Sequence, residues 1–277
     1  MIGAIIGDIV GSVYEFHNIK TKDFPFFRDD CHFTDDTVMT LAVAEGLMNG
    51  GEESDFIKAM KKYGHMYPKA GYGMRFFHWL ASDTTEPYNS WGNGSAMRVS
   101  PVGFYVEPSW DVTSVACSVD TYATRSAEVT HNHPEGIKGA LATANAIMFM
   151  RYRAKDCDNM AEAKAELKSF IQGKYGYDLS RSLDDIRPTY KFTESCQETV
   201  PQAIIAFLES NDFEDAIRNA ISLGGDSDTL AAITGGIAQA AYGVPSWMEE
   251  KALSILDEPL RSVYFRWCDF IRKRDER

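Results

Sequence analysis

The sequence of 277 residues predicts an all-α protein, a single compact orthogonal helical domain over residues 1–277. Apolar residues in its long segments recur three and four positions apart, as on one face of a helix, and few segments alternate with the period of two that a strand requires. Prolines stand mainly at the edges of these segments, where they start or stop helices: Pro68, Pro87, Pro134, Pro245 and Pro259. The chain has no fixed-period repeat and no linker rich in Pro, Gly and Ser, so one domain is expected.

The expected helices follow one another along the chain. Ile5, Ile9, Val13 and Phe16 mark the first, and the second starts near Thr37. Further helical segments cover residues 135–154, 198–210, 213–223, 229–243 and 259–272. Residues 173–193 form the most irregular stretch and predict a long loop or lid.

Composition argues against several classes of protein. A hydrophobic content of 44% is ample for a packed core. The net charge of −12 argues against binding to nucleic-acid phosphates, although a small phosphate-containing ligand is compatible with it. No run of about 18 apolar residues predicts a membrane span, and Asp8 interrupts the one stretch that resembles a signal peptide. The five cysteines are scattered without a C-x-x-C pair, which predicts reduced thiols in a cytoplasmic protein.

Two helices that start far apart in the sequence share the same chemistry. The acids and hydroxyls concerned are Thr34, Asp35 and Asp36 in FTDDT, and Asp226, Asp228 and Thr229 in GGDSDT. A further acid, Glu15, falls on a polar stripe of the first expected helix with Asp8, Gly11 and Ser12.

Each acidic motif, taken alone, is explained as a helix cap, because Asp and Thr are common at helix N-termini and the helix dipole favours negative charge there. One cap needs one side-chain oxygen, however. The five carboxylates and two hydroxyls of these motifs are more than helix capping requires. A hard divalent cation takes about six oxygen ligands, and two such ions roughly 3.5–4 Å apart need several carboxylates. The motifs together therefore favour a site for two Mg²⁺ or Mn²⁺ ions.

A glycine-rich turn supplies a candidate anion site. In SWGNGSAMR, Gly92 and Gly94 flank Asn93, and successive backbone N–H groups at such a turn can hold a phosphate or diphosphate. An ordinary turn is the competing interpretation, since the P-loop and dinucleotide fingerprints are absent. Arg98 could reach an anion or an internal carboxylate. His131, in EVTHNHPEG, could hydrogen-bond a ligand or be a core histidine.

Five of these motifs, in this order, resemble the ADP-ribosylglycohydrolase family, which includes the dinitrogenase-reductase-activating glycohydrolase and the ADP-ribosyl-acceptor hydrolases. They are G-D-x-x-G-S-x-x-E at 7–15, F-T-D-D-T at 33–37, G-N-G-S-A-M-R at 92–98, T-H-x-x-P at 130–134 and G-G-D-S-D-T at 224–229. Ile9 and Val10 stand where many members have Ala-Leu or Ala-Met, which is an apolar exchange. Residues 173–193 match nothing in the family, so the choice of acceptor stays open.

The resemblance implies an all-α fold with two magnesium or manganese ions in a central cleft. The metal ligands that it implies are Thr34, Asp35 and Asp36 from one side and Asp226, Asp228 and Thr229 from the other. The substrate-binding residues that it implies are Asn93, Gly94, Ser95 and Met97, with His131 on the nucleotide side.

The reaction that the resemblance implies is hydrolysis at the anomeric carbon of the distal ribose of ADP-ribose, with release of an acceptor. The partner would be an ADP-ribosylated protein, most simply one modified on arginine; ADP-ribosyl-serine and a small O-acyl-ADP-ribose are the alternatives. Glu15 is the expected catalytic base toward water, with Asp35 or Asp36 as the competing choice.

Three other functions are compatible with the same residues. The first is a catalytically inactive ADP-ribose-binding or structural relative, and the second is a metal-dependent phosphohydrolase. The third is a partner-binding helical domain in which every acid is a cap, which predicts no metal binding.

Overall fold

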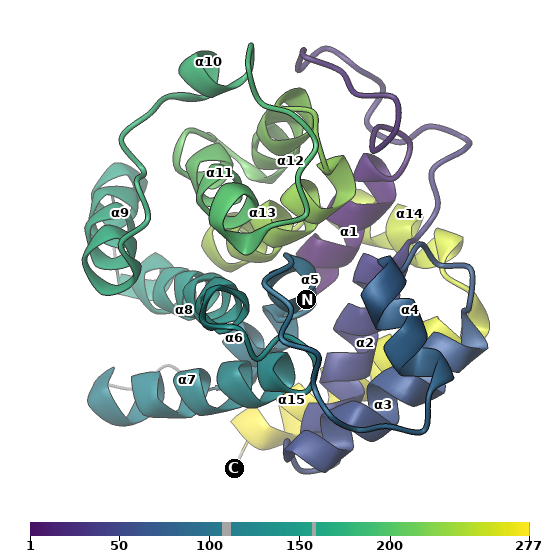
Figure 1. The fold of residues 1–277 in the computed structure, drawn as a ribbon. Coiled ribbons are helices and arrows are strands. Elements are labelled where there is room, and N and C mark those ends of the chain that lie inside the picture. The colour runs from purple at the N-terminus through teal and green to yellow at the C-terminus, as the bar shows by residue number, and fades with distance from the viewer. Residues whose placement is uncertain (107–111, 157–158, 277) are drawn as a thin grey trace.

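A computed structural model describes residues 1–106, 112–156 and 159–276. The regular structure in these ranges is helical, as the sequence predicts (Figure 1). The helices are α1 (Ile2–Gly11), α2 (Asp35–Met48), α3 (Glu53–Met66), α4 (Met74–Ala81), α5 (Gly94–Met97), α6 (Ser100–Tyr105), α7 (Val112–Glu128), α8 (Pro134–Asp156), α9 (Met160–Tyr175), α10 (Leu183–Ile186), α11 (Cys196–Leu208), α12 (Phe213–Ser222), α13 (Ser227–Tyr242), α14 (Ser246–Ile255) and α15 (Glu258–Asp275).

The core is organised around α1 and α13, which pack against each other in the middle of the molecule (Figure 1). Every residue of α1 is buried, which explains why its sequence is apolar nearly all round. Glycines allow the two backbones to touch. A Cβ atom at Gly7 would lie 2.0 Å from the carbonyl oxygen of Ala231, and one at Gly11 would lie 2.5 Å from Cα of Asp228. The first helix is therefore held at backbone distance from the start of α13.

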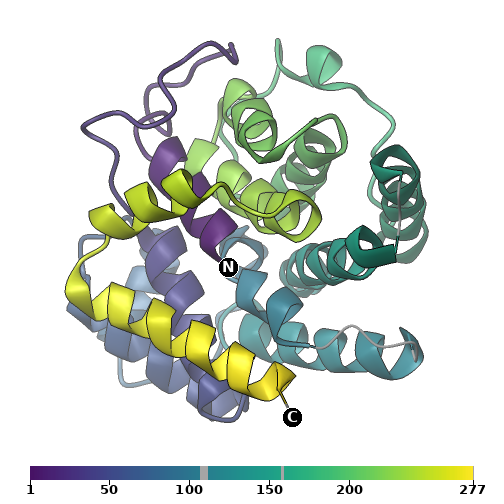
Figure 2. The same ribbon diagram turned by 180° about the vertical axis from the view of Figure 1, so that it is seen from behind.

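The remaining helices surround this pair. Helices α8, α11 and α12 pack on α13, while α2 packs on α1 and α3. Helix α15 also packs on α2, and the view from behind shows it crossing the lower half of that side (Figure 2). Helices α3, α4, α7, α9 and α14 are additions to the segments that the sequence pattern singled out. None of the described helices combines the length and the apolar composition that a membrane span needs.

The first helix is shorter than expected. It ends at Gly11, whereas the apolar spacing predicted that it continues through Val13 to Phe16. Beyond Gly11 the chain turns away, and the Asn18 side chain donates to the backbone carbonyls of Tyr14 and Glu15 in place of helix hydrogen bonds. Phe16 is accordingly 78% exposed. Glu15 thus projects from a turn and not from a polar stripe on a helix.

Residues 173–193 contain more structure than a plain loop. Residues 173–175 complete α9, Gly176 follows it in the left-handed conformation, and residues 183–186 form α10. The buried side chains of Tyr177, Leu179, Leu183 and Ile186 hold the segment against the domain. Its last residues, by contrast, reach the mouth of the cleft described below.

The described thiols agree with the expectation of reduced cysteines. Cys31 and Cys196 are buried and Cys268 is exposed, and all three are free. The side chains of Cys117 and Cys157 fall outside those that the structure describes.

Candidate functional site

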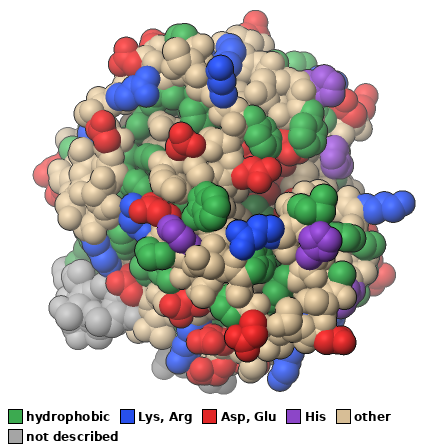
Figure 3. Space-filling model, in the orientation of Figure 1, with side chains coloured by type: hydrophobic (Ala, Val, Ile, Leu, Met, Phe, Trp, Pro, Cys, Tyr) green, Lys and Arg blue, Asp and Glu red, His purple; other side chains and the backbone are tan. Residues whose placement is uncertain are grey.

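A cleft with a volume of about 260 Å³ opens beside the N-termini of α2 and α13. On this face of the molecule, acidic and hydrophobic side chains lie side by side near the middle (Figure 3). The cleft is lined by most of the residues that the sequence singled out, namely Glu15, Asp35, Asp36, Asn93, Gly94, Met97, His131, Asp226, Asp228 and Thr229. Thr34 and Ser95 are buried and are not among the lining residues. The fold therefore brings together motifs that are more than 200 residues apart in sequence.

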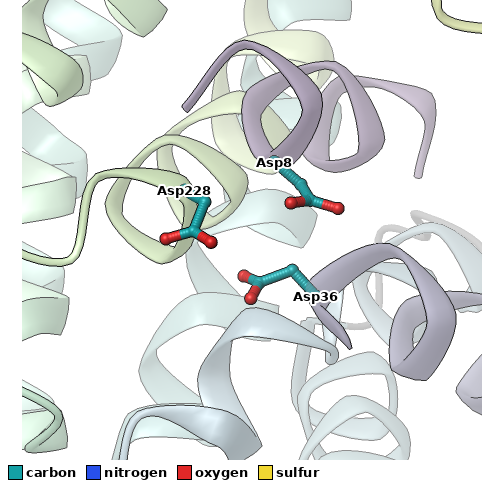
Figure 4. A group of neighbouring side chains, drawn as sticks. All are labelled: Asp8, Asp36 and Asp228. Carbon is teal, nitrogen blue, oxygen red and sulfur yellow. The ribbon is translucent and has the colours of Figure 1, made fainter. Parts of the chain in front are cut away.

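Two groups of carboxylates converge in the cleft. Asp8, Asp36 and Asp228 offer oxygen atoms that all lie within 4.8 Å of one another, and they point toward a common centre (Figure 4). Glu15, Asp226 and Asp228 form a second group by the same measure. Asp228 belongs to both, so the two groups are adjacent. Asp35 lines the same cleft but belongs to neither group.

Asp8 is the site residue that the sequence analysis left out of its ligand set. It is fully buried in the middle of α1 and accepts hydrogen bonds from the backbone N–H of Thr34 and of Thr37, each at 3.0 Å. The Thr34 hydroxyl also donates to it at 2.7 Å. The sequence signal that could have identified it is an aspartate within an otherwise apolar helix. Such a helix is expected to be buried, and a buried carboxylate requires polar or charged partners.

Burial and mutual repulsion raise the pKa values of these acids. Burial is the main cause for Asp36 and Asp228, followed by the charges of Asp228 and Asp226 respectively, and both pKa values lie well above the usual range. Burial, with the charge of Glu15, also raises the pKa of Asp226 to about 7, against the Asn93 hydrogen bond that lowers it. For Glu15, burial and the charges of Asp228, Asp8 and Glu194 raise the pKa to about 8. A positive charge nearby would stabilise the ionised form of these acids and lower their pKa values.

The residues fit a hard divalent cation. Within the described chain, none of the acids in the two groups forms an ion pair with Lys or Arg. Asp36 Oδ1 is buried and has no hydrogen-bond partner among the residues that the structure describes. Carboxylate and hydroxyl oxygens are the ligands that Mg²⁺ and Mn²⁺ prefer, and no cysteine or histidine belongs to either group. The clusters could therefore hold a metal ion.

The helix-cap interpretation is partly right. Thr34 is the N-cap of α2, and its Oγ1 accepts a hydrogen bond from the Asp36 backbone N–H at 3.3 Å. Asp226 is the N-cap of α13, but its side chain caps nothing. It accepts instead from Asn93 Nδ2 at 2.7 Å. The Thr34 side chain thus caps α2. Asp35, Asp36, Asp226 and Asp228 are not needed as caps and line the cleft.

Asn18 fixes the turn that carries Glu15. It exchanges two hydrogen bonds with Gly225: its Nδ2 donates to the Gly225 carbonyl at 2.9 Å, and its Oδ1 accepts from the Gly225 N–H at 2.7 Å. Gly224 and Gly225 both adopt positive φ, which favours glycine. The Glu15 turn is therefore attached directly to the segment that leads into Asp226.

The glycine-rich turn adjoins the carboxylates. The Asn93 backbone N–H donates to the Glu194 carbonyl at 2.7 Å, and the Asn93 side chain reaches Asp226 as described above. Ser95 turns its hydroxyl away from the cleft and donates to the Gly136 carbonyl at 2.7 Å. The backbone N–H groups of Gly94 and Ser95 donate to no group among the described residues. They remain available to an anion.

His131 and Arg98 lie buried on the other side of this turn. Burial, with the charges of Arg98 and Arg75, holds the pKa of His131 well below its usual range, so the ring is neutral. Arg98 donates to the Ser126 carbonyl and to the Thr130 hydroxyl, each at 2.8 Å. Among the described residues Arg98 has no carboxylate partner. The sequence-based suggestion that it pairs with an internal carboxylate is therefore wrong for these residues.

Two exposed aromatic rings stand at the rim of the cleft. Phe16 and Phe192 are stacked with their ring centroids 6.4 Å apart, and Phe192 lines the cleft together with the exposed Glu194. Phe16 follows Glu15 directly in the chain. The pair therefore borders the acidic end of the cleft.

Comparison with known proteins identifies the family of this chain. The family model described as ADP-ribosylglycohydrolase matches residues 1–269. The chain belongs to the ADP-ribosylglycohydrolase family. Its all-α fold and its classification as a hydrolase follow from this membership, and the family resemblance read from the five motifs is confirmed.

Individual relatives agree with the family. The chain is 27% identical to the ADP-ribosylhydrolase ARH3 of Gallus gallus, covering 97% of this chain and 92% of that protein. It is also 27% identical to the ADP-ribosylarginine hydrolase Tri1 of Pseudomonas putida (strain GB-1), covering 92% and 73%. A solved structure titled "ADP-ribosylglycohydrolase-related protein complex" superposes with a TM-score of 0.66 at 23% identity, covering 98% of this chain and 96% of that one. That structural likeness supports the fold.

Proposed function

We propose that the protein is a metal-dependent ADP-ribosyl hydrolase that cleaves the glycosidic bond between ADP-ribose and an arginine side chain. The observation that carries the proposal is that one cleft contains two adjacent carboxylate groups and, beside them, a turn whose backbone N–H groups at Gly94 and Ser95 have no partner among the described residues. The carboxylates suit a cation-bound ribose, and the turn suits a diphosphate. In ADP-ribose the distal ribose is attached directly to the diphosphate.

The metal ligands in this proposal are Asp36, Asp226 and Asp228, with Thr34, Asp35 and Thr229 as the further candidates taken from the sequence. Two Mg²⁺ or Mn²⁺ ions, held there, would supply the positive charge that orients the hydroxyls of the distal ribose and a water molecule. Asp8 joins the first group of acids and also fixes the backbone of Thr34.

Glu15 is the proposed general base. Its carboxylate lies beside Asp228 and belongs to the second group, at the end of the cleft that would hold the distal ribose. Glu15 takes a proton from the attacking water as the oxygen bonds to the anomeric carbon. The bond to the acceptor breaks, and the acceptor leaves with the proton that Glu15 received. Asp35 and Asp36 are the competing bases.

The remaining residues bind the ligand. Asn93 holds the turn against Asp226, while Gly94 and Ser95 offer backbone N–H groups to the diphosphate. Met97 and His131 line the cleft around it. No residue in this account requires nucleic acid as a partner.

The rim supports arginine as the acceptor. A guanidinium group is planar and cationic, so it can lie against an aromatic ring and pair with a carboxylate. The rim offers Phe16, Phe192 and Glu194 in one place. Serine-linked and O-acyl-linked ADP-ribose have neutral leaving groups that would not use this charge, and they are the alternative substrates.

The decisive experiment is a release assay. Arginine-linked and serine-linked ADP-ribose are incubated with the full chain and Mg²⁺ or Mn²⁺, with and without excess EDTA, and the products are identified. Release of free ADP-ribose from the arginine linkage, lost with EDTA, is the expected result. AMP with ribose phosphate would instead indicate a phosphohydrolase. Binding of ADP-ribose without turnover of either linkage would indicate an inactive relative.

A further inference from the structure

Three buried side chains form a hydrogen-bonded chain that ends at the glycine-rich turn. Arg98 Nη2 donates to Thr130 Oγ1 at 2.8 Å, and this oxygen lies 2.8 Å from Nδ1 of His131. The three residues are 1%, 0% and 5% exposed, so water does not compete for these bonds. Arg98 Nη2 also donates to the Ser126 carbonyl at 2.8 Å, which fixes the position of the guanidinium.

The chemistry of the groups gives this chain a direction. Arginine has only donors, so Thr130 Oγ1 must accept from Arg98. Thr130 has a single hydroxyl hydrogen, and Nδ1 of His131 lies within hydrogen-bond distance of it. The hydroxyl can donate to Nδ1 only if Nδ1 carries no hydrogen.

The charge of Arg98 favours the same direction. A neutral imidazole is dipolar, with its negative end at the bare nitrogen and its positive end at the N–H. Arg98 lies on the Nδ1 side, behind Thr130, and no acid intervenes in the chain. A cation at this end of the ring favours the lone pair at Nδ1 and the hydrogen at Nε2.

Nε2 faces the glycine-rich turn. A Cβ atom built at Gly94 would lie 3.1 Å from Nε2, and one built at Gly92 would lie 3.5 Å from it. The absence of a side chain at Gly94 therefore leaves Nε2 open to the cleft, which His131 lines. Only a hydrogen at Nε2 makes this nitrogen a donor toward an anion at the turn.

We propose that Thr130 and Arg98 are positioning residues, which hold His131 in its neutral Nε2–H tautomer so that Nε2 donates to a diphosphate oxygen of the ligand. The ligand identity rests on the proposed function, whereas the tautomer does not. The opposite tautomer would present a lone pair to the phosphate and repel it. The hydroxyl of Thr130 thus acts on substrate binding without touching substrate.

The test is long-range ¹H–¹⁵N spectroscopy of the full chain labelled at histidine, with His131 assigned by the spectrum of His131→Gln. A bare Nδ1 and a protonated Nε2 are expected in the wild type between pH 6 and pH 8. Thr130→Val should lose this pattern and weaken ADP-ribose binding by about 10-fold, while kcat changes little because His131 belongs to neither carboxylate group. Thr130→Ser keeps the hydroxyl and should retain both properties.

A matched control separates the role of the hydroxyl from its burial. Thr143 is fully buried in α8, and its hydroxyl has no hydrogen-bond partner in the described part of the chain, so Thr143→Val should leave tautomer and binding unchanged. A wild-type spectrum with the hydrogen at Nδ1 would overturn the inference whatever the protein binds, even if Thr130→Val does not fold. Wild-type binding that survives in Thr130→Val would also overturn it. Failure of the wild type to bind ADP-ribose, with the expected tautomer, would overturn the proposed function and leave the tautomer established.

Discussion

Thr34 donates its hydroxyl hydrogen to Asp8 at 2.7 Å and so joins the start of α2 to the middle of α1, 26 residues earlier in the chain. Asp8 accepts two backbone N–H groups from the same segment, those of Thr34 and Thr37. The carboxylate therefore does two things. It shapes the turn that presents Asp36, and it contributes an oxygen to the same group of acids.

Asp8→Asn is expected to weaken metal binding by about 10- to 100-fold, because it removes one charge and puts an amide nitrogen, which cannot accept, in place of an oxygen such as the one that accepts the Thr34 hydroxyl. Calorimetric titration of Mn²⁺ measures the effect. Asp29→Asn, which makes the same change of charge at an exposed position, should bind as the wild type does. Equal affinity in Asp8→Asn and the wild type would contradict the role given to Asp8.

The role of Asp8 also shows where the sequence analysis stopped. The motifs identified Asp36, Asp226 and Asp228, because hydroxyls and paired acids before an apolar helix form a readable pattern. They did not identify Asp8, since its place depends on how closely α1 approaches α13. That approach depends on glycines of one helix that contact the backbone of the other. The spacing of apolar residues does not indicate which glycines make such contacts.

The same limit explains the error over the first helix. Apolar spacing predicted a helix through Phe16, but the side chain of Asn18 captures the carbonyls of Tyr14 and Glu15 and binds Gly225, a residue 207 positions away. A tertiary contact of this kind overrides local pattern. By contrast, the helices starting at Pro134 and Phe213, whose apolar residues recur regularly, were predicted to within a residue or two.

Gly7→Ala tests the close contact of α1 with α13. A methyl group there would meet the backbone of Ala231, so the helices must separate, and the free energy of unfolding should fall by about 3 kcal/mol or more. Urea denaturation measures this fall. Gly173→Ala is the matched control: it lies in α9, where, apart from the neighbouring backbone of the same helix, no described atom comes within 4 Å of the added carbon, and it should stabilise the protein by about 0.5–1 kcal/mol. A neutral Gly7→Ala would show that the approach is looser.

Metal binding should be visible as stability, independently of turnover. A cation that binds only the folded chain at 100 times its dissociation constant adds about 2.7 kcal/mol, so Mn²⁺ should raise the melting temperature of the wild type. Asp36→Asn removes a buried charge that repels Asp228, and it should be more stable than the wild type in EDTA and gain less from Mn²⁺. Asp228→Ala should abolish both the gain and hydrolysis. Full activity in excess EDTA would refute the metal mechanism.

The rim should control the choice of acceptor. Phe192→Ala removes a ring that stacks on Phe16 and lines the cleft, so kcat/KM for arginine-linked ADP-ribose should fall by about 5- to 30-fold, the worth of a cation–π contact of 1–2 kcal/mol. Serine-linked substrate should be affected less, because its leaving group has no charge. Phe265→Ala, which removes a ring that is also exposed, on α15, should change neither. A uniform loss on both substrates would mean that Phe192 only supports the fold.

The buried neutral His131 should make the protein less stable in mild acid. In the unfolded chain the ring takes up a proton near pH 6.5, whereas burial and the neighbouring arginines keep it unprotonated in the folded chain. The unfolded state then binds more protons, so the free energy of unfolding falls as pH drops below 6.5. Between pH 6.5 and 5.5 the wild type should lose about 1 kcal/mol more than His131→Gln, which cannot titrate. Urea denaturation at several pH values measures both curves, which should run parallel above pH 7.5 and separate below 6.5. Parallel curves throughout would mean that His131 takes up its proton at the same pH in the folded protein as in the unfolded chain, and that burial does not hold the ring neutral in mild acid.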